Sequence, residues 1–359
     1  MNKVSLVVDR INPQGTDAVE LVFLDEQKQI GSFWPGQFIT LLLEIEGKSV
    51  RRSYSICSVP AELPRLAVCV KKVAGGLASH YLNQQLKVGD RVEVLEPYGN
   101  FSLHYTQSAL PDLVLVAAGS GITPLLSMLR SSLTHAGNRI YLFYGSRSYA
   151  DILFRPELAE LQARYPERLR IAHYLSRDQH AECATGRLDL PAILHSMNSW
   201  PAFRQNEANF YLCGPKSLMD AVETGLSAHG TAPARIHRES FVLTVSENTT
   251  ETRETPPPAG SDTGKRTSYT VQLVLEGRTH SLAVGIGRHI LETALDAGLD
   301  LPYACTMGVC GMCRAFKVQG QMHIGEQEAL SRSEMEQGYC LTCVGTPLSD
   351  DLLIDYDRK

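Results

Sequence analysis

The stretch "PYACTMGVCGMC", residues 302–313, places three cysteines within nine residues and separates them with Gly308 and Gly311. Glycine reaches backbone conformations that let a chain curl tightly around a bound anion and direct its amide hydrogens at sulfur. A further pair, Cys340 and Cys343, follows closer to the C-terminal end. The fold and function of this part of the chain therefore depend on what these thiols hold.

Two sets of four ligands are possible. Cys310 and Cys313 paired with Cys340 and Cys343 form the C-x2-C pattern of a zinc site, but 26 residues separate the pairs instead of about 15–20. The set Cys305, Cys310, Cys313 and Cys343 accounts for the glycines and has the C-x4-C-x2-C spacing of a plant-type [2Fe–2S] cluster. We therefore predict the cluster, with Cys340 packed in the core; zinc and a disulfide are the alternatives.

Length and composition describe an ordinary folded chain of two or three domains. Its 359 residues are 43% hydrophobic and 20% charged, with a formal net charge of -5. This charge argues against general nucleic-acid binding, which needs a concentrated basic face. The N-terminal residues lack the apolar core of a signal peptide, and no stretch reaches the ~20 apolar residues of a membrane helix. We therefore expect a cytoplasmic protein without membrane insertion, where nine cysteines favour metal binding or catalysis.

The chain divides into segments of different pattern. Residues 1–105 contain short β-rich runs broken by Gly, Pro and Asp, which predicts an antiparallel β-barrel. Residues 106–243 alternate buried strands with helices, which predicts an α/β domain with a parallel sheet. Residues 244–267 are rich in Thr, Ser, Glu and Pro, so we expect a linker. The cysteine-rich unit occupies 268–359.

The β-rich part carries two segments suited to a flavin nucleotide. In "RRSYSIC", residues 51–57, an arginine offers a forked donor for phosphate and a tyrosine offers a ring for stacking. An isolated R-x-Y-S is more often an ordinary exposed strand, but "KKVAGGLASHYL", residues 71–82, follows and opens a helix where a pyrophosphate can bind. The positions predicted to bind the flavin are Arg52, Tyr54, Ser55, Lys71, Gly76 and Ser79.

The α/β part carries three segments suited to a nicotinamide nucleotide. In "AAGSGITP", residues 117–124, Gly119 and Gly121 let the backbone approach a phosphate at a helix N-terminus. The segments "YGSR", 144–147, and "CGP", 213–215, fall at later strand ends, where open parallel sheets bind ligands. The positions predicted to bind NAD(P)H are Gly119, Gly121, Thr123, Pro124, Ser146, Arg147, Cys213, Gly214 and Pro215.

Together these motifs resemble the ferredoxin–NADP⁺ reductase superfamily joined to a C-terminal plant-type ferredoxin domain. The likeness covers nearly the whole chain apart from the linker and extends to "GYCLTCVGTPLSDDLLI" and "ESF", residues 239–241. It implies FAD in preference to FMN and a β-grasp fold for the ferredoxin unit. It also implies roles in positioning and proton handling at the flavin for Ser55, Cys213 and Glu239, with Phe241 nearby.

The order of flavin barrel, nucleotide domain and ferredoxin most resembles the reductase subunits of phenylacetyl-CoA epoxidase systems, and so implies a place in phenylacetate catabolism. Reductases of other oxygenases (Rieske or diiron) and of hybrid-cluster protein share this order. NAD(P)H gives two electrons at once and the cluster accepts one, so the resemblance implies that FAD divides the pair. A cluster near roughly -400 mV then supplies a partner oxygenase or epoxidase. A redox-sensing protein without turnover is the alternative from another class.

Overall fold

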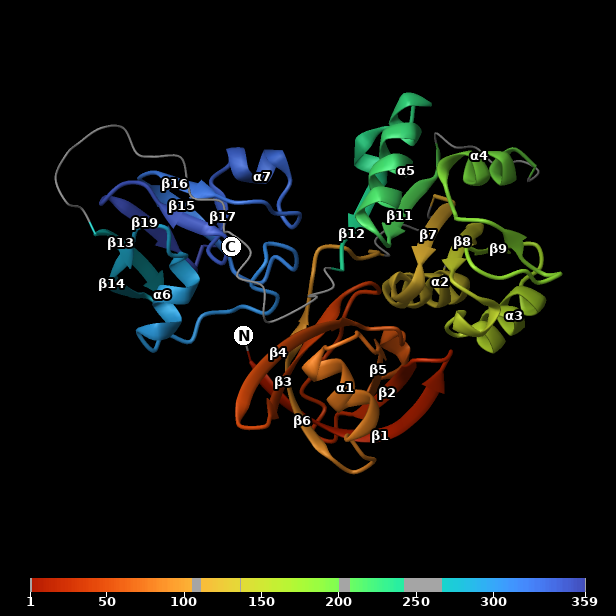
Figure 1. Ribbon diagram of the computed structural model, residues 1–359, viewed down its shortest axis with the longest axis horizontal. Coiled ribbons are helices and arrows are strands. Elements are labelled where there is room, and N and C mark those ends of the chain that lie inside the picture. The colour runs from red at the N-terminus through yellow and green to blue at the C-terminus, as the bar shows by residue number, and fades with distance from the viewer. Residues whose placement is uncertain (1, 105–110, 136, 200–206, 242–266, 359) are drawn as a thin grey trace. The chain divides into compact units, whose positions relative to one another are not determined.

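The computed structural model describes residues 2–104, 111–135, 137–199, 207–241 and 267–358 (Figure 1). The chain forms two compact units, Met1–Val245 and Ser246–Lys359. The predicted linker, 244–267, lies outside the described residues except for its last position. Within the described ranges, none of the helices has the length and apolar character needed to cross a membrane.

The first unit begins with a six-stranded antiparallel sheet. Its order is β4–β3–β6–β1–β2–β5, and an antiparallel bridge between Ile56 and Val68 joins its two ends into a barrel. Alternate residues of the strands face inward, as the buried Val4, Leu6 and Val8 show. The strands are β1 (Lys3–Gln14), β2 (Ala18–Leu24), β3 (Phe38–Ile45), β4 (Lys48–Ser55), β5 (Arg65–Lys71) and β6 (Arg91–Tyr98), with α1 (Leu77–Gln84) packed against β3 and β5.

The unit continues with a parallel sheet between two layers of helices (Figure 1). Its strand order is β10–β9–β8–β7–β11–β12. The strands are β7 (Leu113–Ala118), β8 (Ile140–Ser146), β9 (Leu169–Leu175), β10 (Ala184–Thr185), β11 (Asn209–Cys213) and β12 (Ile236–Glu239). The helices are α2 (Ile122–His135), α3 (Arg155–Arg164), α4 (Leu190–Ser199) and α5 (Lys216–Ala228).

The central strand β7 is buried on both faces, which explains its continuous apolar sequence. Leu113, Leu115 and Ala117 pack in one core with residues of α2 and α3, whereas Val114 and Val116 pack in another with residues of α4 and α5. The first core also contains residues from the barrel: Ala18, Val22, Cys57, Ala67 and Cys69. The barrel and the parallel sheet therefore share one hydrophobic core.

The second unit is a mixed sheet of order β14–β13–β19–β15–β17 that packs on a short helix. A two-stranded ribbon, β16–β18, accompanies it. Its elements are β13 (Ser268–Leu275), β14 (Arg278–Gly285), α6 (Ile290–Asp296), β15 (Arg314–Gln319), β16 (Met322–Ile324), α7 (Arg332–Glu336), β17 (Tyr339–Leu341), β18 (Gly345–Pro347) and β19 (Leu352–Asp355). The predicted fold class, a barrel followed by an α/β domain and a β-grasp unit, is confirmed.

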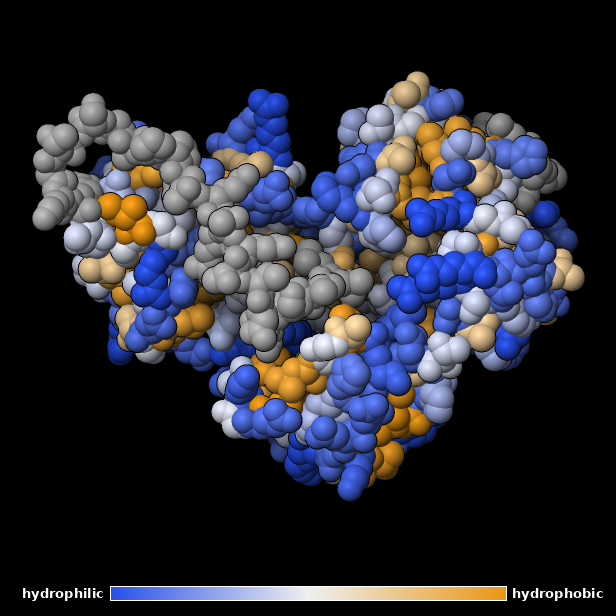
Figure 2. Space-filling view, viewed as in Figure 1, coloured by the Kyte–Doolittle hydropathy of each residue, from blue (hydrophilic) through white to orange (hydrophobic). Residues whose placement is uncertain are grey.

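The surface mixes polar and apolar side chains, as the face drawn in Figure 2 shows. Scattered exposed apolar side chains are normal on folded proteins, so only those beside a candidate site need an explanation. The large exposed apolar residues among those described are Trp34, Val88, Phe241, Ile286, Val318, Met335 and Leu348. Of these, Phe241 lies two residues after Glu239, which ends the last strand of the parallel sheet.

Arg168 provides a test of this packing because it caps α2. Its guanidinium donates to the carbonyl oxygens of Ser132, Leu133 and Asn138 at 3.0, 3.1 and 3.2 Å. Arg168→Met should lower the free energy of unfolding by about 2 kcal/mol, because these acceptors lose a charged donor. Urea titration followed by circular dichroism measures this change in the free energy of unfolding. The exposed Arg170→Met is the matched control, and equal effects of the two substitutions would contradict this role.

Candidate functional site

Two of the predicted nucleotide segments meet at the carboxyl edge of the parallel sheet. Strands β7 and β11 are neighbours, with Ala117 opposite Cys213. A Cβ atom on Gly121 would lie 2.0 Å from the carbonyl oxygen of Cys213 and 3.2 Å from its Sγ. Only glycine permits this approach, so "GSG" and "CGP" form one contiguous surface.

The other residues of these segments shape the same edge. Gly119 adopts the left-handed φ of 56°, and a Cβ atom on Gly214 would lie 3.0 Å from that of Ala118. The Thr123 hydroxyl donates to the Ser120 carbonyl at 3.0 Å, closing the turn before α2. Pro124 is buried in the first turn of α2, and Pro215 is the N-cap of α5.

The three residues predicted to act at the flavin also come together. Glu239 ends β12 directly opposite Cys213, and the Ser55 hydroxyl at the end of β4 donates to Glu239 Oε2 at 3.3 Å. Burial raises the pKa of Glu239 to about 8, while the hydrogen bond from Ser55 opposes this shift. Burial, and then the charge of Glu239, raise the pKa of the Cys213 thiol. We call Ser55, Cys213 and Glu239 the junction.

The remaining flavin residues flank the junction. Arg52 and Tyr54 lie on β4, where the Arg52 guanidinium donates to the Arg51 carbonyl at 2.9 Å. Burial raises the pKa of Tyr54, which therefore stays neutral. Phe241, 37% exposed, follows Glu239 by two residues. An exposed aromatic ring close in sequence to a half-buried carboxyl suits the edge of a flat ligand.

The second predicted flavin segment forms a tight turn, and an ion pair holds its first residue, Lys71. Gly76 is the N-cap of α1. The Ser79 hydroxyl accepts from the Val73 amide at 3.1 Å and donates to the Gly76 carbonyl at 3.0 Å. The Lys71 ammonium instead pairs with Asp17 at 3.4 Å. Lys71 is therefore engaged with the turn between β1 and β2.

Two Ser–Arg pairs lie side by side at the carboxyl ends of β8 and β9. Ser146 and Arg147 were predicted from the sequence, whereas Ser176 and Arg177 were missed. The amides of Ser176 and Arg177 donate to the carbonyls of Ser146 and Arg147 at 3.0 and 2.9 Å. The Ser146 side chain is buried, and the other three side chains are exposed. The repeated "SR" after consecutive strands could have revealed the second pair.

In the second unit, backbone amides converge on the sulfur atoms of the loop between α6 and β15. The amides of Met307, Val309 and Cys310 each donate to Cys305 Sγ at 3.4 Å. Hydrogen bonds from the neighbouring thiols Cys310 and Cys343, and then from the amides of Met307 and Cys310, lower the pKa of the Cys305 thiol, while burial opposes this shift. Such donors stabilise negative charge on sulfur, as the ligands of an iron–sulfur cluster require. The donor set therefore fits the cluster.

Gly308 joins Cys343 to the same loop through a hydrogen bond. Its amide donates to Cys343 Sγ at 3.3 Å, and its φ of 73° is left-handed. A Cβ atom there would lie 2.8 Å from Cβ of Gln327. The conformation and the space both require glycine, which brings the loop and the fourth predicted ligand together.

Cys340 is placed differently from the other four cysteines of this unit. It lies in β17 opposite Ala315, and its thiol donates to the Ala315 carbonyl at 3.5 Å. Its side chain is buried in the core of the sheet, and burial raises its pKa to about 12. The hydrogen bond to Ala315 within the sheet supports the prediction that Cys340 packs and does not bind metal.

Comparison with known proteins gives the family. Three family models match: oxidoreductase FAD-binding domain over residues 12–103, oxidoreductase NAD-binding domain over 115–224, and 2Fe-2S iron-sulfur cluster binding domain over 273–348. The ferredoxin reductase component of 3-ketosteroid-9-alpha-monooxygenase from Mycolicibacterium smegmatis is 34% identical over 99% of this chain and 97% of its own. The chain belongs to the ferredoxin–NADP⁺ reductase superfamily, with a fused plant-type [2Fe–2S] domain.

Other similar proteins share the complete arrangement. One of the subunits that make up the 1,2-phenylacetyl-CoA epoxidase of Escherichia coli is 33% identical over 99% of this chain and 98% of its own. The solved structure of phthalate dioxygenase reductase has the same fold, with a TM-score of 0.62 and 24% identity over 99% of this chain and 98% of its own. The protein is an NAD(P)H-dependent oxidoreductase that uses FAD and a [2Fe–2S] cluster. The predicted superfamily, enzyme class and cofactors are confirmed, and the zinc alternative is set aside.

The raised pKa of Glu239 predicts a pH dependence of stability. Between pH 4.5, the ordinary value, and about 8, the folded state keeps a proton that the unfolded state releases, so stability falls as pH rises. Glu239→Gln removes this titration. Because Glu239 is only half-buried, wild type should lose less than about 1.4 kcal/mol per pH unit relative to the variant. Urea unfolding of both across this window measures the difference, and parallel pH profiles would contradict the raised pKa.

Proposed function

We propose that this reductase carries electrons from NAD(P)H through FAD and the [2Fe–2S] cluster to a partner oxygenase or epoxidase component. The similar proteins named above are components of such systems. We favour an epoxidase of the phenylacetyl-CoA type, and hence phenylacetate catabolism. A Rieske or diiron oxygenase, or hybrid-cluster protein, is the alternative acceptor. We place the protein in the cytoplasm, which suits nine cysteines without disulfides.

The junction is the observation that carries this proposal. Ser55 belongs to the barrel, whereas Cys213 and Glu239 belong to the carboxyl edge of the parallel sheet, and the hydrogen bond from Ser55 to Glu239 joins them. A flavin held by the barrel and a nicotinamide held by the sheet edge would therefore meet there. When bound, FAD supplies the ability to accept a hydride and release its electrons singly.

The chain's own residues then bind, orient and move protons. Glu239, protonated below a pH of about 8, can hold a proton beside the flavin, and the Ser55 hydroxyl keeps its carboxyl in place. The neutral, buried thiol of Cys213 lines the nicotinamide position. Residues proposed to hold FAD are Arg52, Tyr54, Ser55, Gly76, Ser79 and Phe241. Lys71, which pairs with Asp17, is proposed to hold FAD as well.

The proposed coenzyme site runs along the carboxyl edge of the sheet. The nicotinamide and pyrophosphate would bind at Gly119, Gly121, Thr123, Pro124, Cys213, Gly214 and Pro215. The two Ser–Arg pairs, Ser146–Arg147 and Ser176–Arg177, would bind the adenosine end, because guanidinium groups suit its phosphates.

The proposed domain bounds are 1–105 for the flavin domain, 106–243 for the nucleotide domain and 268–359 for the ferredoxin domain, with the linker at 244–267.

The proposed cluster ligands are Cys305, Cys310, Cys313 and Cys343, which paired substitutions can test. Cys343→Ser should abolish the visible absorption and electron paramagnetic resonance of the normal cluster, because the fourth thiolate is lost. Cys340→Ser is the matched control and should keep both spectra, because Cys340 lies in the sheet core. The opposite pattern would show that Cys340 is the ligand.

A reconstituted assay tests the choice of acceptor. The reductase is mixed with the oxygenase components of a phenylacetyl-CoA epoxidase or with a Rieske oxygenase, and NAD(P)H-dependent product formation is measured. We expect at least about tenfold faster turnover with the epoxidase, equivalent to about 1.4 kcal/mol of preference. Faster turnover with the Rieske oxygenase would overturn this choice. Failure to reduce cytochrome c over repeated turnovers would instead favour a redox-sensing protein.

A further inference from the structure

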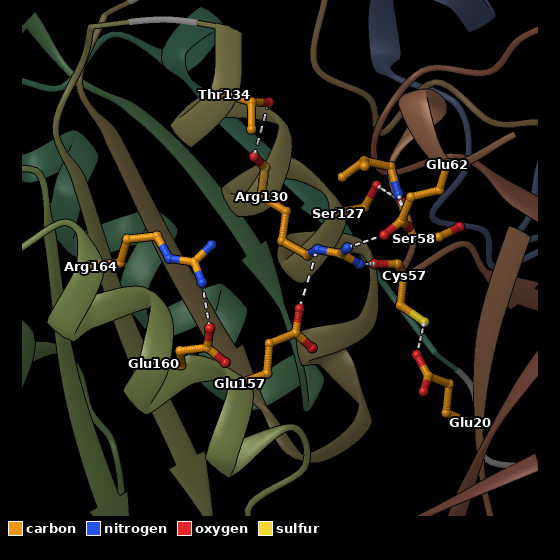
Figure 3. A network of polar contacts seen from close by, with 11 residues as sticks. Glu20, Cys57, Ser58, Glu62, Ser127, Arg130, Thr134, Glu157, Glu160 and Arg164 are labelled. Carbon is orange, nitrogen blue, oxygen red and sulfur yellow. Dashed lines mark hydrogen bonds and ion pairs between the residues drawn. The ribbon is translucent and has the colours of Figure 1, made fainter.

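Helix α2 links the nucleotide edge to the barrel through one arginine. Arg130 lies in this helix and its side chain is 23% exposed. Its guanidinium forms an ion pair with Glu62, at the end of the short helix Pro60–Glu62 in the barrel, and another with Glu157 of α3 at 3.2 Å. It also donates to the Cys57 carbonyl at 3.5 Å (Figure 3). One side chain of α2 thus contacts both the barrel and α3.

A second residue of α2 holds the adjacent peptide. The Ser127 hydroxyl, one turn before Arg130, donates to the Ser58 carbonyl at 2.6 Å in a buried position. Ser127 and Arg130 therefore bind two successive carbonyls, those of Cys57 and Ser58. These carbonyls directly follow β4, whose last residue is Ser55 of the junction.

Arg130 lies among carboxylates, and its positive charge offsets their negative charge. Burial raises the pKa of Glu157, Arg130 opposes that shift, and the nearby charges of Glu20 and Glu62 reinforce it. The Cys57 thiol in turn lies 4.0 Å from Glu20 (Figure 3). Without Arg130, Glu62 of the barrel and Glu157 of α3 would lose the guanidinium that pairs with both, and their repulsion would act to separate these elements.

Both ends of this connection reach the proposed site of electron transfer. Helix α2 begins at Ile122, beside Gly121, whose backbone packs against Cys213. The segment that Ser127 and Arg130 hold begins at Ser55, which contacts Glu239. A small change in the separation of reacting groups can slow a reaction about a hundredfold. A rigid connection between the start of α2 and the segment that begins at Ser55 should therefore affect the rate of electron transfer.

We propose that Arg130 is a positioning residue that fixes the flavin-side segment 55–58 relative to the helix carrying the nucleotide turn. This inference rests on the proposed function, in which a hydride with its two electrons passes from NAD(P)H to FAD, oxidising the first and reducing the second. Arg130 touches neither reactant. It acts through Cys57, Glu62 and Glu157.

The test compares Arg130→Met and Arg130→Lys with Arg164→Met in the complete, FAD-loaded chain. Arg164 pairs with Glu160 on the exposed side of α3, so it is a matched ion pair away from the barrel (Figure 3). Arg130→Met should slow flavin reduction at saturating NAD(P)H by about tenfold or more in stopped-flow measurements. The coenzyme dissociation constant should change less than about twofold, because the nucleotide segments are untouched. Arg130→Lys should recover part of the rate, and Arg164→Met should match wild type.

Two readouts separate positioning from a general loss of stability. The long-wavelength charge-transfer absorbance of the coenzyme–flavin complex should weaken in Arg130→Met. Hydrogen exchange of the peptide containing Cys57 and Ser58 should become faster in the same variant before coenzyme is added. If Arg130→Met fails to retain FAD, the same measurements are made on Arg130→Lys and Glu62→Gln. Flavin reduction in these two variants should be about threefold slower than in wild type.

Wild-type rate, absorbance and exchange in the Arg130 variants would overturn the inference while leaving the proposed function intact. A wild-type chain whose flavin NAD(P)H does not reduce would refute the proposed function itself. The two failures are therefore distinguishable.

Discussion

The close approach of Gly121 to the carbonyl of Cys213 is the constraint on which the arrangement of the site depends. A Cβ atom at Gly121 would lie 2.0 Å from that oxygen, so the nucleotide turn can lie over Cys213 only if residue 121 is glycine. Strand register then places Cys213 beside Glu239, and Glu239 reaches Ser55 of the barrel. One chain of short contacts thus connects the nucleotide turn with the flavin strand. The hydrophobic core shared by the barrel and the sheet holds these elements together.

The same physical chemistry acts in opposite directions at the two redox centres of this reductase. At the junction, burial disfavours charge and keeps Glu239 protonated below a pH of about 8. In the cysteine loop, amides directed at Cys305 and Cys343 favour negative charge on sulfur. One environment is suited to holding a proton beside the flavin, and the other is suited to thiolate ligands. The first follows from burial of the Glu239 carboxyl, and the second follows from backbone amides that point at sulfur.

Local patterns predicted the fold and most of the site because their signals lie within a few residues. A G-x-G turn after a continuously apolar strand, and cysteines at cluster spacing separated by glycines, specify their surroundings directly. Arg130 could not be recognised, since a single arginine in an amphipathic helix ordinarily faces solvent. The partner of Lys71 could not be found because Asp17 meets it only through the pairing of β2 with β5. Ser176 and Arg177 can be placed beside Ser146 and Arg147 only once β8 and β9 are known to be neighbours.

FAD is the obligatory link between coenzyme and cluster in this mechanism, and a flavin-free preparation tests that role most directly. The complete chain is stripped of FAD with its cluster retained, mixed anaerobically with NAD(P)H, and followed by electron paramagnetic resonance for the reduced cluster. The cluster should stay oxidised until FAD is added back and should then be reduced, because the coenzyme gives two electrons together and the cluster accepts one. Reduction of the cluster by NAD(P)H at the wild-type rate without FAD would contradict this mechanism.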